Sequence, residues 1–233
     1  MKKVLIGGCS FSQKMIWENG VEDGSWVAWT DLFQKEYGTT FEIINRAKSS
    51  FGQSKIVESL LDELIKYNFE VDYVIIQWSA VLRGYITHYN DFFDKITKQG
   101  EIDFLPYIHE YLSDPDKVSN VTNINDLTEL TFYKASLNQI FLMKSLLEYK
   151  NIPFTMFWGW EQITPNIEFQ LGDLLNQIYS DSFWRYKKHG GMNEYLIESI
   201  GETNAILHND FHPSSKGHRF FYDNIIKELI KKI

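Results

Sequence analysis

Cysteine is almost absent from this sequence of 233 residues, in which Cys9 is the only one. A single cysteine cannot close a disulfide within the chain, so a disulfide framework and a cysteine-rich metal site are both excluded. The histidines His88, His109, His189 and His208 do not show the spacing of metal ligands. We therefore expect no metal site.

Positive charge is also scarce, with 23 Lys and Arg residues against 31 Asp and Glu residues and a formal net charge of −8. Binding to nucleic acid without sequence preference requires clustered Lys and Arg side chains that neutralise phosphates. This composition argues against such a function, and we expect no nucleic-acid partner.

Long apolar runs are missing as well. No segment approaches the roughly 20 apolar residues of a membrane helix. The apolar stretch that starts at Val4 is shorter than the about 7–15 residues that the apolar region of a signal peptide needs, so we interpret it as a strand. We therefore expect a soluble, cytoplasmic protein with no membrane partner.

Aromatic residues, in contrast, are abundant: the chain contains 7 Trp, 13 Tyr and 17 Phe. This is more ring surface than a minimal α/β core requires, so we expect some of these residues to line a cleft or a partner surface. The chain length favours one domain with insertions, and nothing repeats at a fixed period. We therefore interpret residues 1–233 as a single domain.

Short apolar segments that alternate with helical patterns predict an α/β fold. Strands are predicted at 41–45, 73–79 and 154–160 and from Val4 onward, where Gly7 and Gly8 break the first strand into a tight turn. Strands separated by helices form a parallel sheet, and ligands bind beyond the carboxyl ends of its strands. The predicted helices are 26–37, 54–67, 126–149, 167–179 and 219–233.

Two stretches interrupt this pattern and are interpreted as insertions. Residues 80–125 are rich in aromatic, polar and acidic side chains and contain Pro106 and Pro115. They form either a solvated excursion or an aromatic-rich cap that acts as a lid or specificity wall. Residues 180–207 look irregular, with the glycine pair 190–191 as punctuation, and are the second predicted insertion.

Ser10 lies on the turn after the first strand, and His212 lies before Pro213 at the start of the last helical pattern. A serine nucleophile needs a general base, and the base needs a group that orients its imidazole. An Asp-x-His segment, Asp210 to His212, supplies both if it reaches the same edge of the sheet. The plain alternative for Ser10 is a helix-capping serine in an ordinary first loop.

These two segments resemble motifs of the SGNH, or GDSL-like, hydrolases. Residues 8–12, Gly-Cys-Ser-Phe-Ser, are similar to the first block of that family, Gly-Asp-Ser-Phe-Ser, which contains the nucleophile. Residues 210–218 are similar to the final block, in which an Asp and a His just before Pro complete the triad. The resemblance implies a flavodoxin-like three-layer α/β/α sandwich with a central parallel sheet and an inserted cap.

The resemblance also implies an activity and the residues that perform it. The expected reaction is hydrolysis of an ester, often an acyl or acetyl group on a sugar or lipid, through an acyl-enzyme and without a cofactor. Ser10 is then the nucleophile, His212 the base and Asp210 the orienting acid, with Asn209 as a neutral alternative. Cys9 replaces the aspartate of the first block, as either a small buried hydrophobe or a nucleophile.

The residues for the oxyanion hole match the family less well. Asn45 and Gly52 are similar to the second block, whose glycine N–H helps to bind the oxyanion. The family usually has Gly-x-Asn-Asp after the third strand, but the chain has Gln77-Trp78-Ser79 there and lacks the donating Asn. Ser79 or Gln77 is the candidate substitute, and Arg83 is a candidate for binding a substrate anion. Loss of one oxyanion donor typically costs about 10²–10³ in turnover.

Three functions remain open at this point. The first is a serine esterase that acts on a small-molecule or carbohydrate-linked ester. The second is a catalytically weakened binding or assembly protein with the same fold, which the missing Asn favours. The third is a nucleotide- or phosphate-binding protein that uses the Gly7-Gly8 loop, and it ranks last because no phosphate-loop lysine motif follows. We expect His218 to be a structural helix residue.

Overall fold

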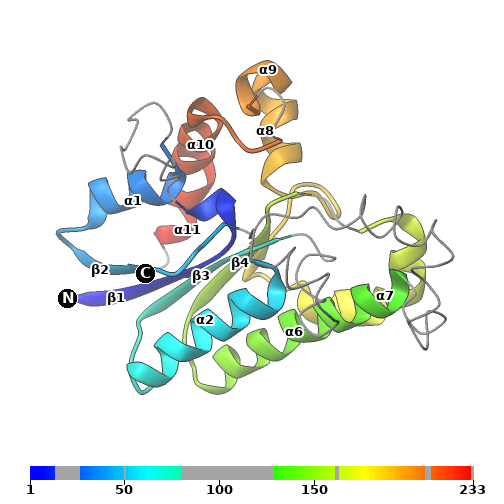
Figure 1. Cartoon of the computed structure of the whole chain (residues 1–233), viewed down its shortest axis with the longest axis horizontal. Helices are drawn as coiled ribbons and strands as arrows, with labels where there is room; N and C mark the ends of the chain where they lie inside the picture. The colour runs from blue at the N-terminus through cyan, green and yellow to red at the C-terminus, as the bar shows by residue number, and fades with distance from the viewer. Residues whose placement is uncertain (14–26, 50, 80–128, 161–162, 208–210, 232–233) are drawn as a thin grey trace, which may run out of the picture.

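The computed structural model describes residues 1–13, 27–49, 51–79, 129–160, 163–207 and 211–231. At its centre is a five-stranded parallel sheet with the strand order β2-β1-β3-β4-β5 (Figure 1). The strands are β1 (Lys2–Gly7), β2 (Phe41–Asn45), β3 (Tyr73–Trp78), β4 (Phe154–Trp158) and β5 (Phe183–Trp184). The predicted parallel α/β fold is confirmed.

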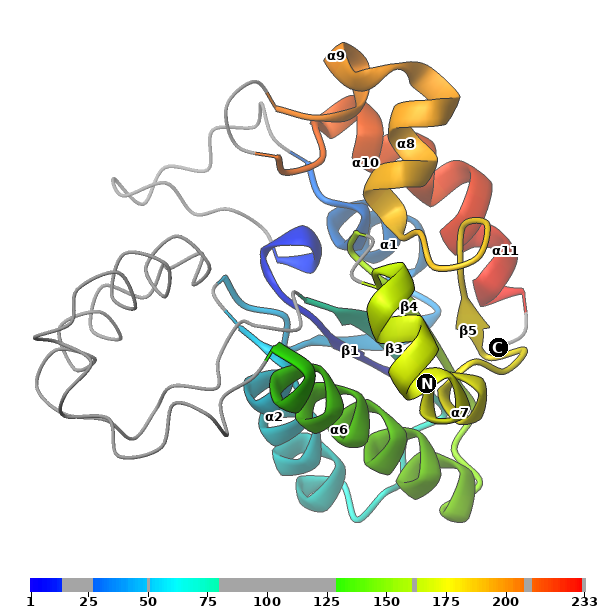
Figure 2. The ribbon, with the colours of Figure 1, turned by 90° about the vertical axis from the view of Figure 1, so that its right-hand side faces the viewer.

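Helices cover both faces of the sheet and complete the three predicted layers, as Figure 2 shows from the side. One face carries α2 (Gln53–Lys66), α6 (Glu129–Tyr149) and α7 (Pro165–Ile178). The other carries α1 (Trp29–Tyr37), α8 (Met192–Ile200), α9 (Glu202–Ala205), α10 (Ser215–Phe221) and α11 (Lys227–Ile230), with a π-helical turn, η3 (Tyr222–Ile226), between the last two.

Alternating side chains of the strands divide the core into two apolar clusters. Leu5 and Ile76 pack into the cluster with α2, α6 and α7, whereas Val4, Ile6 and Ile75 pack into the cluster with α1 and α10. This follows from strand geometry, in which successive side chains point to opposite faces. All six residues of β3 are buried, as expected for a central strand of a parallel sheet.

The structure differs from the sequence-based prediction at several element boundaries. The last helix begins at Ser215, four residues earlier than predicted, because the hydroxyl of Ser214 caps it by accepting a hydrogen bond from the N–H of Gly217 at 3.0 Å. The predicted irregular segment 180–207 contains β5, α8 and α9. The predicted cap, 80–125, lies outside the described residues.

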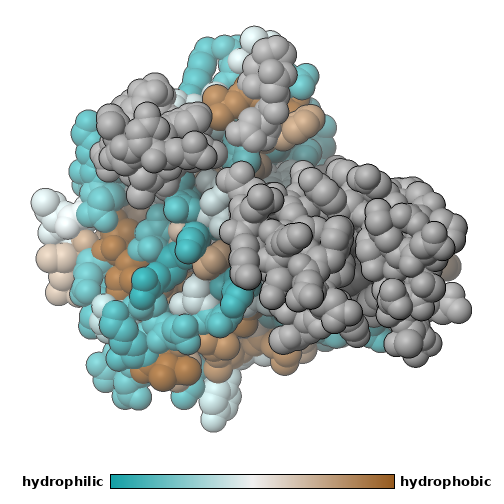
Figure 3. Space-filling view, viewed as in Figure 1, coloured by the Kyte–Doolittle hydropathy of each residue, from teal (hydrophilic) through white to brown (hydrophobic). Residues whose placement is uncertain are grey.

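The visible surface of the described part is mostly hydrophilic, with separate hydrophobic patches (Figure 3). None of the described helices combines the length and the apolar character needed to cross a membrane. The exposed large hydrophobic side chains are Met1, Ile65, Leu142, Tyr149, Phe169, Ile197 and Phe211, and only Leu142 and Tyr149 of these share an element, α6.

Candidate active site

The nucleophile candidate, Ser10, begins a short 3₁₀ helix, η1 (Ser10–Ser12), which Gly8 and Cys9 connect to the end of β1. The turn of residues 9–12, hereafter the nucleophile turn, is closed by a hydrogen bond of 3.0 Å from the N–H of Ser12 to the carbonyl of Cys9. Helix α2 packs closely against the end of β1, because a Cβ atom on Gly7 would lie only 2.7 Å from the side chain of Leu60. Since Ser10 follows the carboxyl end of β1, it lies at the carboxyl edge of the sheet, and it is 3% exposed.

His212 meets Ser10 at this edge although 202 residues separate them in the chain. The distance from Ser10 Oγ to His212 Nε2 is 2.7 Å, a short hydrogen bond. In the tautomer with the proton on Nδ1, the serine hydroxyl donates to Nε2, which is the arrangement that a general base requires. The structure thus brings together two of the three predicted triad residues.

The backbone of the His212 segment is anchored on both sides. Ile206 and Pro213 form an antiparallel bridge, and the N–H of Leu207 donates to the carbonyl of His212 at 2.8 Å. The side chain of Asn193 donates from Nδ2 to the carbonyl of Phe211 at 2.9 Å. These contacts hold the backbone of the segment in the position from which the imidazole of His212 reaches Ser10.

Phe211 and Asn193 were not predicted as site residues. Phe211 has a φ of 50°, in the left-handed region that residues other than glycine rarely adopt, and it is 79% exposed. Asn193 follows the glycine pair 190–191 in the first turn of α8. Because Asn193 lies 18 residues before Phe211 in the chain, only the fold reveals their contact.

An aromatic wall lies beside the imidazole. The ring centroid of Phe11 is 5.1 Å from that of His212 and 4.9 Å from that of Trp160. Phe11 is 4% exposed, so it fills the space between the nucleophile turn and the end of β4. This arrangement keeps apolar surface against one side of the His212 ring.

Two predicted site residues, Asp210 and Arg83, lie outside the described residues. Asn209, the predicted alternative to Asp210, also lies outside them. Among the described residues, no three His, Cys, Asp or Glu side chains are grouped as a metal site would require.

The side chain of Asn45 connects the loop after β2 to the nucleophile turn. Its Nδ2 donates to the carbonyl of Ser12 at 2.9 Å, and its Oδ1 accepts from the N–H of Ala47 at 2.9 Å. The N–H of Lys48 donates to the carbonyl of Gly8 at 3.2 Å in the same region. The structure therefore places Asn45 as a brace between two loops at the sheet edge.

Gly52 and Ser79 belong to neighbouring loops at this edge. Gly52 is the N-cap residue of α2, which begins at Gln53, one residue before the predicted start at 54. The side chain of Gln53 donates from Nε2 to the carbonyl of Ser79 at 2.7 Å, which joins the two loops. Both Gly52 and Ser79 are buried.

Gln77 is fully buried at the end of β3, and both ends of its carboxamide are used within the protein. Its Oε1 accepts from the N–H of Cys9 at 3.1 Å, and its Nε2 donates to the carbonyl of Trp78 at 2.6 Å. The predicted oxyanion donor is thus already bonded to a backbone carbonyl. Cys9 is also fully buried.

A pocket of about 370 Å³ opens next to the nucleophile turn. Its volume is in the range of small-molecule sites, about 300–1,000 Å³. Six of its eight lining residues are charged or polar, and the lining residues are Gln13, Asn45, Arg46, Ala47, Lys48, Phe51, Ser59 and Asp62. Arg46 also forms an ion pair with Glu63, a residue that is 2% exposed.

His218 is fully buried in α10, in agreement with the predicted structural role. The backbone N–H of Trp29 donates to its Nδ1 at 3.4 Å. Burial, and to a smaller extent the charge of the nearby His212, lowers the pKa of His218 from 6.5 to about 3. His218 is therefore neutral at pH 7.

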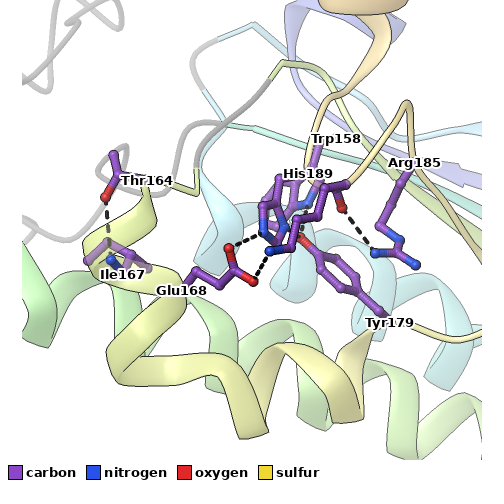
Figure 4. A network of polar contacts seen from close by, with 8 residues as sticks. Trp158, Thr164, Ile167, Glu168, Tyr179, Arg185 and His189 are labelled. Carbon is purple, nitrogen blue, oxygen red and sulfur yellow. Dashed lines mark hydrogen bonds and ion pairs between the residues drawn. The ribbon is translucent and has the colours of Figure 1, made fainter.

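A second polar cluster ties α7 to the segment after β5 (Figure 4). His189 Nε2 lies 3.2 Å from Glu168 Oε2, and His189 Nδ1 lies 3.1 Å from the hydroxyl of Tyr179. Trp158 Nε1 donates to the same hydroxyl at 3.3 Å. The hydrogen bond from Lys188, and then the one from His189, hold the pKa of Glu168 below its usual 4.5.

Three solved structures match the chain over almost its full length. The psychrotrophic esterase EstA from Pseudoalteromonas sp. has a TM-score of 0.56 at 12% identity, with 100% of this chain and 98% of that chain covered. TesA has a TM-score of 0.52 at 12% identity, with 100% of both chains covered. The lipase/acylhydrolase from Enterococcus faecalis has a TM-score of 0.55 at 10% identity, with 100% of this chain and 97% of that chain covered.

No family model matches the sequence, and a search of curated proteins gives no match. The likeness to the solved structures is therefore one of fold. The chain has the α/β fold of the SGNH, or GDSL-like, hydrolases, as the two sequence motifs predict.

Proposed function

We propose that this protein is a serine ester hydrolase in which Ser10 is the nucleophile and His212 is the general base. The observation that carries the proposal is the 2.7 Å hydrogen bond between Ser10 Oγ and His212 Nε2. A serine hydroxyl is a weak nucleophile at neutral pH, and an adjacent imidazole activates it by accepting its proton. The fold supports the same reaction class, because two proteins that share it are named as an esterase and a lipase/acylhydrolase.

The reaction proceeds in two steps. In the first, Ser10 Oγ attacks the carbonyl carbon of the ester while its proton passes to His212 Nε2. The bond to the alcohol oxygen breaks, the alcohol leaves with the proton from His212, and the acyl group remains on Ser10. In the second, water transfers a proton to His212 and attacks the acyl carbon, and Ser10 leaves with that proton. Asp210 is proposed to hold the imidazole in the required tautomer.

The oxyanion that forms in each step needs hydrogen-bond donors. The N–H of Ser10 is at the start of η1, where helical geometry provides no partner within the helix. We assign this N–H, with the N–H of Gly52 and a contribution from Ser79, to the oxyanion hole. Arg83 remains our candidate for a substrate anion.

The pocket beside the nucleophile turn suggests the kind of alcohol that the ester contains. Arg46, Lys48 and Asp62 line it, and charged walls suit hydroxyl groups better than a long alkyl chain. We therefore propose a small polar alcohol, such as a carbohydrate, as the leaving group of an acetyl or other short acyl ester.

A binding or assembly protein is the second candidate. The sequence lacks the usual oxyanion Asn, and the amide nitrogen of Gln77 is bonded to the carbonyl of Trp78. Such a protein would bind an ester or its product without turning it over.

Hydrolysis of p-nitrophenyl acetate by the purified protein distinguishes the two. The proposal predicts steady turnover that Ser10→Ala and His212→Ala each reduce by at least about 10³-fold, as loss of a nucleophile or base does in serine hydrolases. Ser54→Ala is the matched control, because it also removes a serine hydroxyl, but one that bonds to Gln139 on α6. Turnover that survives in Ser10→Ala, or that is absent from the folded wild-type protein, would contradict the proposal.

A further inference from the structure

We infer that Gln77 is a positioning residue whose carboxamide holds the nucleophile turn in its reactive geometry. The inference rests on the proposed function of Ser10. Three donors of the turn converge on one oxygen, Gln77 Oε1. They are the N–H of Cys9 at 3.1 Å, the thiol of Cys9 at 3.2 Å and the hydroxyl of Ser12 at 3.3 Å. Ser10 stands between the two residues that supply these donors.

The other end of the carboxamide fixes its orientation. Gln77 Nε2 donates to the carbonyl of Trp78 at 2.6 Å. If the amide were rotated by half a turn, its NH₂ group would face the N–H of Cys9 and its oxygen would face the carbonyl of Trp78. Both contacts would then be repulsive, so one orientation alone satisfies the site. The position therefore requires a side chain with an acceptor and a donor at fixed places.

Two glycines leave the space that the carboxamide occupies. A Cβ atom on Gly8 would lie 3.1 Å from Gln77 Oε1, and a Cβ atom on Gly159 would lie 2.7 Å from Gln77 Nε2. In the sheet, Gly7 of β1 pairs with Ile76 of β3, so Gly8 continues β1 beside Gln77. Close packing on two sides confines the amide to this slot.

The turn is held from its outer side as well. The hydroxyl of Ser12 accepts from Trp29 Nε1 at 3.1 Å, and the carbonyl of Ser12 accepts from Asn45 Nδ2 at 2.9 Å. Gln77 supplies the inner side of the same brace. Since the hydrogen bonds of the Gln77 side chain go to Cys9, Ser12 and Trp78, it acts on the reaction through the turn and not by touching the ester.

The requirement for both an acceptor and a donor makes the inference testable with two variants. Gln77→Met keeps the length of the side chain but can neither accept strongly nor donate. Gln77→Glu keeps the acceptor, but as a carboxylate it places negative charge against the carbonyl of Trp78. As a protonated carboxylic acid it again offers a C=O acceptor and an O–H donor, and burial raises the pKa of such a group.

The test measures the second-order rate at which a fluorophosphonate probe labels Ser10, from pH 8 to pH 5.5. We expect Gln77→Met to be labelled about 10–100-fold more slowly than wild type, since a small displacement of reacting groups costs up to about 10²-fold. We expect the ratio of Gln77→Glu to wild type to rise as the pH falls. Gln139→Met is the control for loss of a carboxamide elsewhere.

Two results would overturn the inference: a labelling rate for Gln77→Met within twofold of wild type, or a ratio of Gln77→Glu to wild type that does not change with pH. In both cases the labelling of the wild-type protein would leave the proposed function intact. If Gln77→Met does not fold, the pH dependence of Gln77→Glu decides alone. Absence of labelling in the folded wild-type protein would instead contradict the proposed function, and the inference with it.

Discussion

Asn193 on α8 donates a hydrogen bond of 2.9 Å to the carbonyl of Phe211, the residue directly before His212. The contact holds the backbone of Phe211 in its left-handed conformation, which costs about 1–2 kcal/mol for a residue other than glycine. A helix that carries none of the predicted catalytic residues thus supports the position of His212, the proposed general base.

We therefore expect Asn193→Ala to lower kcat for ester hydrolysis about fivefold, which corresponds to the roughly 1 kcal/mol of one hydrogen bond. KM should change less, because Asn193 bonds to the backbone of Phe211. Asn204→Ala removes a similar bond, from Asn204 Nδ2 to the carbonyl of Ile200, and is the control. Steady-state kinetics of the two variants test this, and equal kcat values in both would count against a positioning role.

Folding stability should decrease as the pH falls below 6.5, because of His218. Its pKa is about 3 in the folded protein and near 6.5 when unfolded, so the unfolded chain binds the additional proton between these values. The contribution of His218 to the free energy of unfolding is then fully present above pH 6.5, and it decreases by up to about 1.4 kcal/mol per pH unit toward pH 3. The free energy of unfolding, measured with urea at pH 7, 6 and 5, should fall less steeply with decreasing pH for His218→Gln than for wild type. An equal pH dependence in the two proteins would contradict this assignment.

The ion pair of Glu168 with Lys188, beside the contact with His189, should produce a separate acid sensitivity. Its folded pKa lies below 4.5, so its contribution to stability is present above pH 4.5 and is lost as the pH falls through the folded value. Glu168→Gln should therefore lower the melting temperature at pH 7 and have little effect at pH 3. Glu198→Gln, which breaks an exposed pair with Lys187, is the matched comparison. A deficit that persists unchanged at pH 3 would argue against the ion pair as its source.

The polar pocket predicts a preference among alcohols. An acetylated monosaccharide should be hydrolysed with a higher kcat/KM than hexyl acetate, and Ser59→Leu should remove that preference by narrowing the pocket. We expect a change of about tenfold, within the range that one methylene group produces in a binding pocket. Ser54→Leu on the same helix lies outside the pocket lining and serves as control. A preference for hexyl acetate in the wild-type protein would contradict a polar alcohol site.

The alternation of apolar strands with amphipathic helices was sufficient to predict a parallel α/β sheet, because strands and helices have distinct periods, and the resemblance to the SGNH hydrolases implied the three layers. It also indicated Ser10 and His212, since each follows a recognisable pattern at an element boundary. The chain between them did not show how they are held together. The brace by Gln77 and the contact of Asn193 with Phe211 depend on residues that are distant in sequence and have no special pattern of their own.

Helix boundaries were missed for a local reason. The predicted irregular segment 180–207 contains α8, whose N-cap is Gly191 rather than a Ser, Thr, Asp or Asn residue. The N–H of Gly191 instead donates to the side chain of Glu194 at 2.8 Å. The glycine pair that suggested a break in structure therefore marks the start of a helix.

The most direct test of the central claim is the mass of the intact protein after reaction with a fluorophosphonate probe. The hydrogen bond between Ser10 Oγ and His212 Nε2 predicts a single adduct that is absent from Ser10→Ala and strongly reduced in His212→Ala. No adduct on the folded wild-type protein, or an adduct that persists in Ser10→Ala, would contradict an activated Ser10 and favour the binding protein.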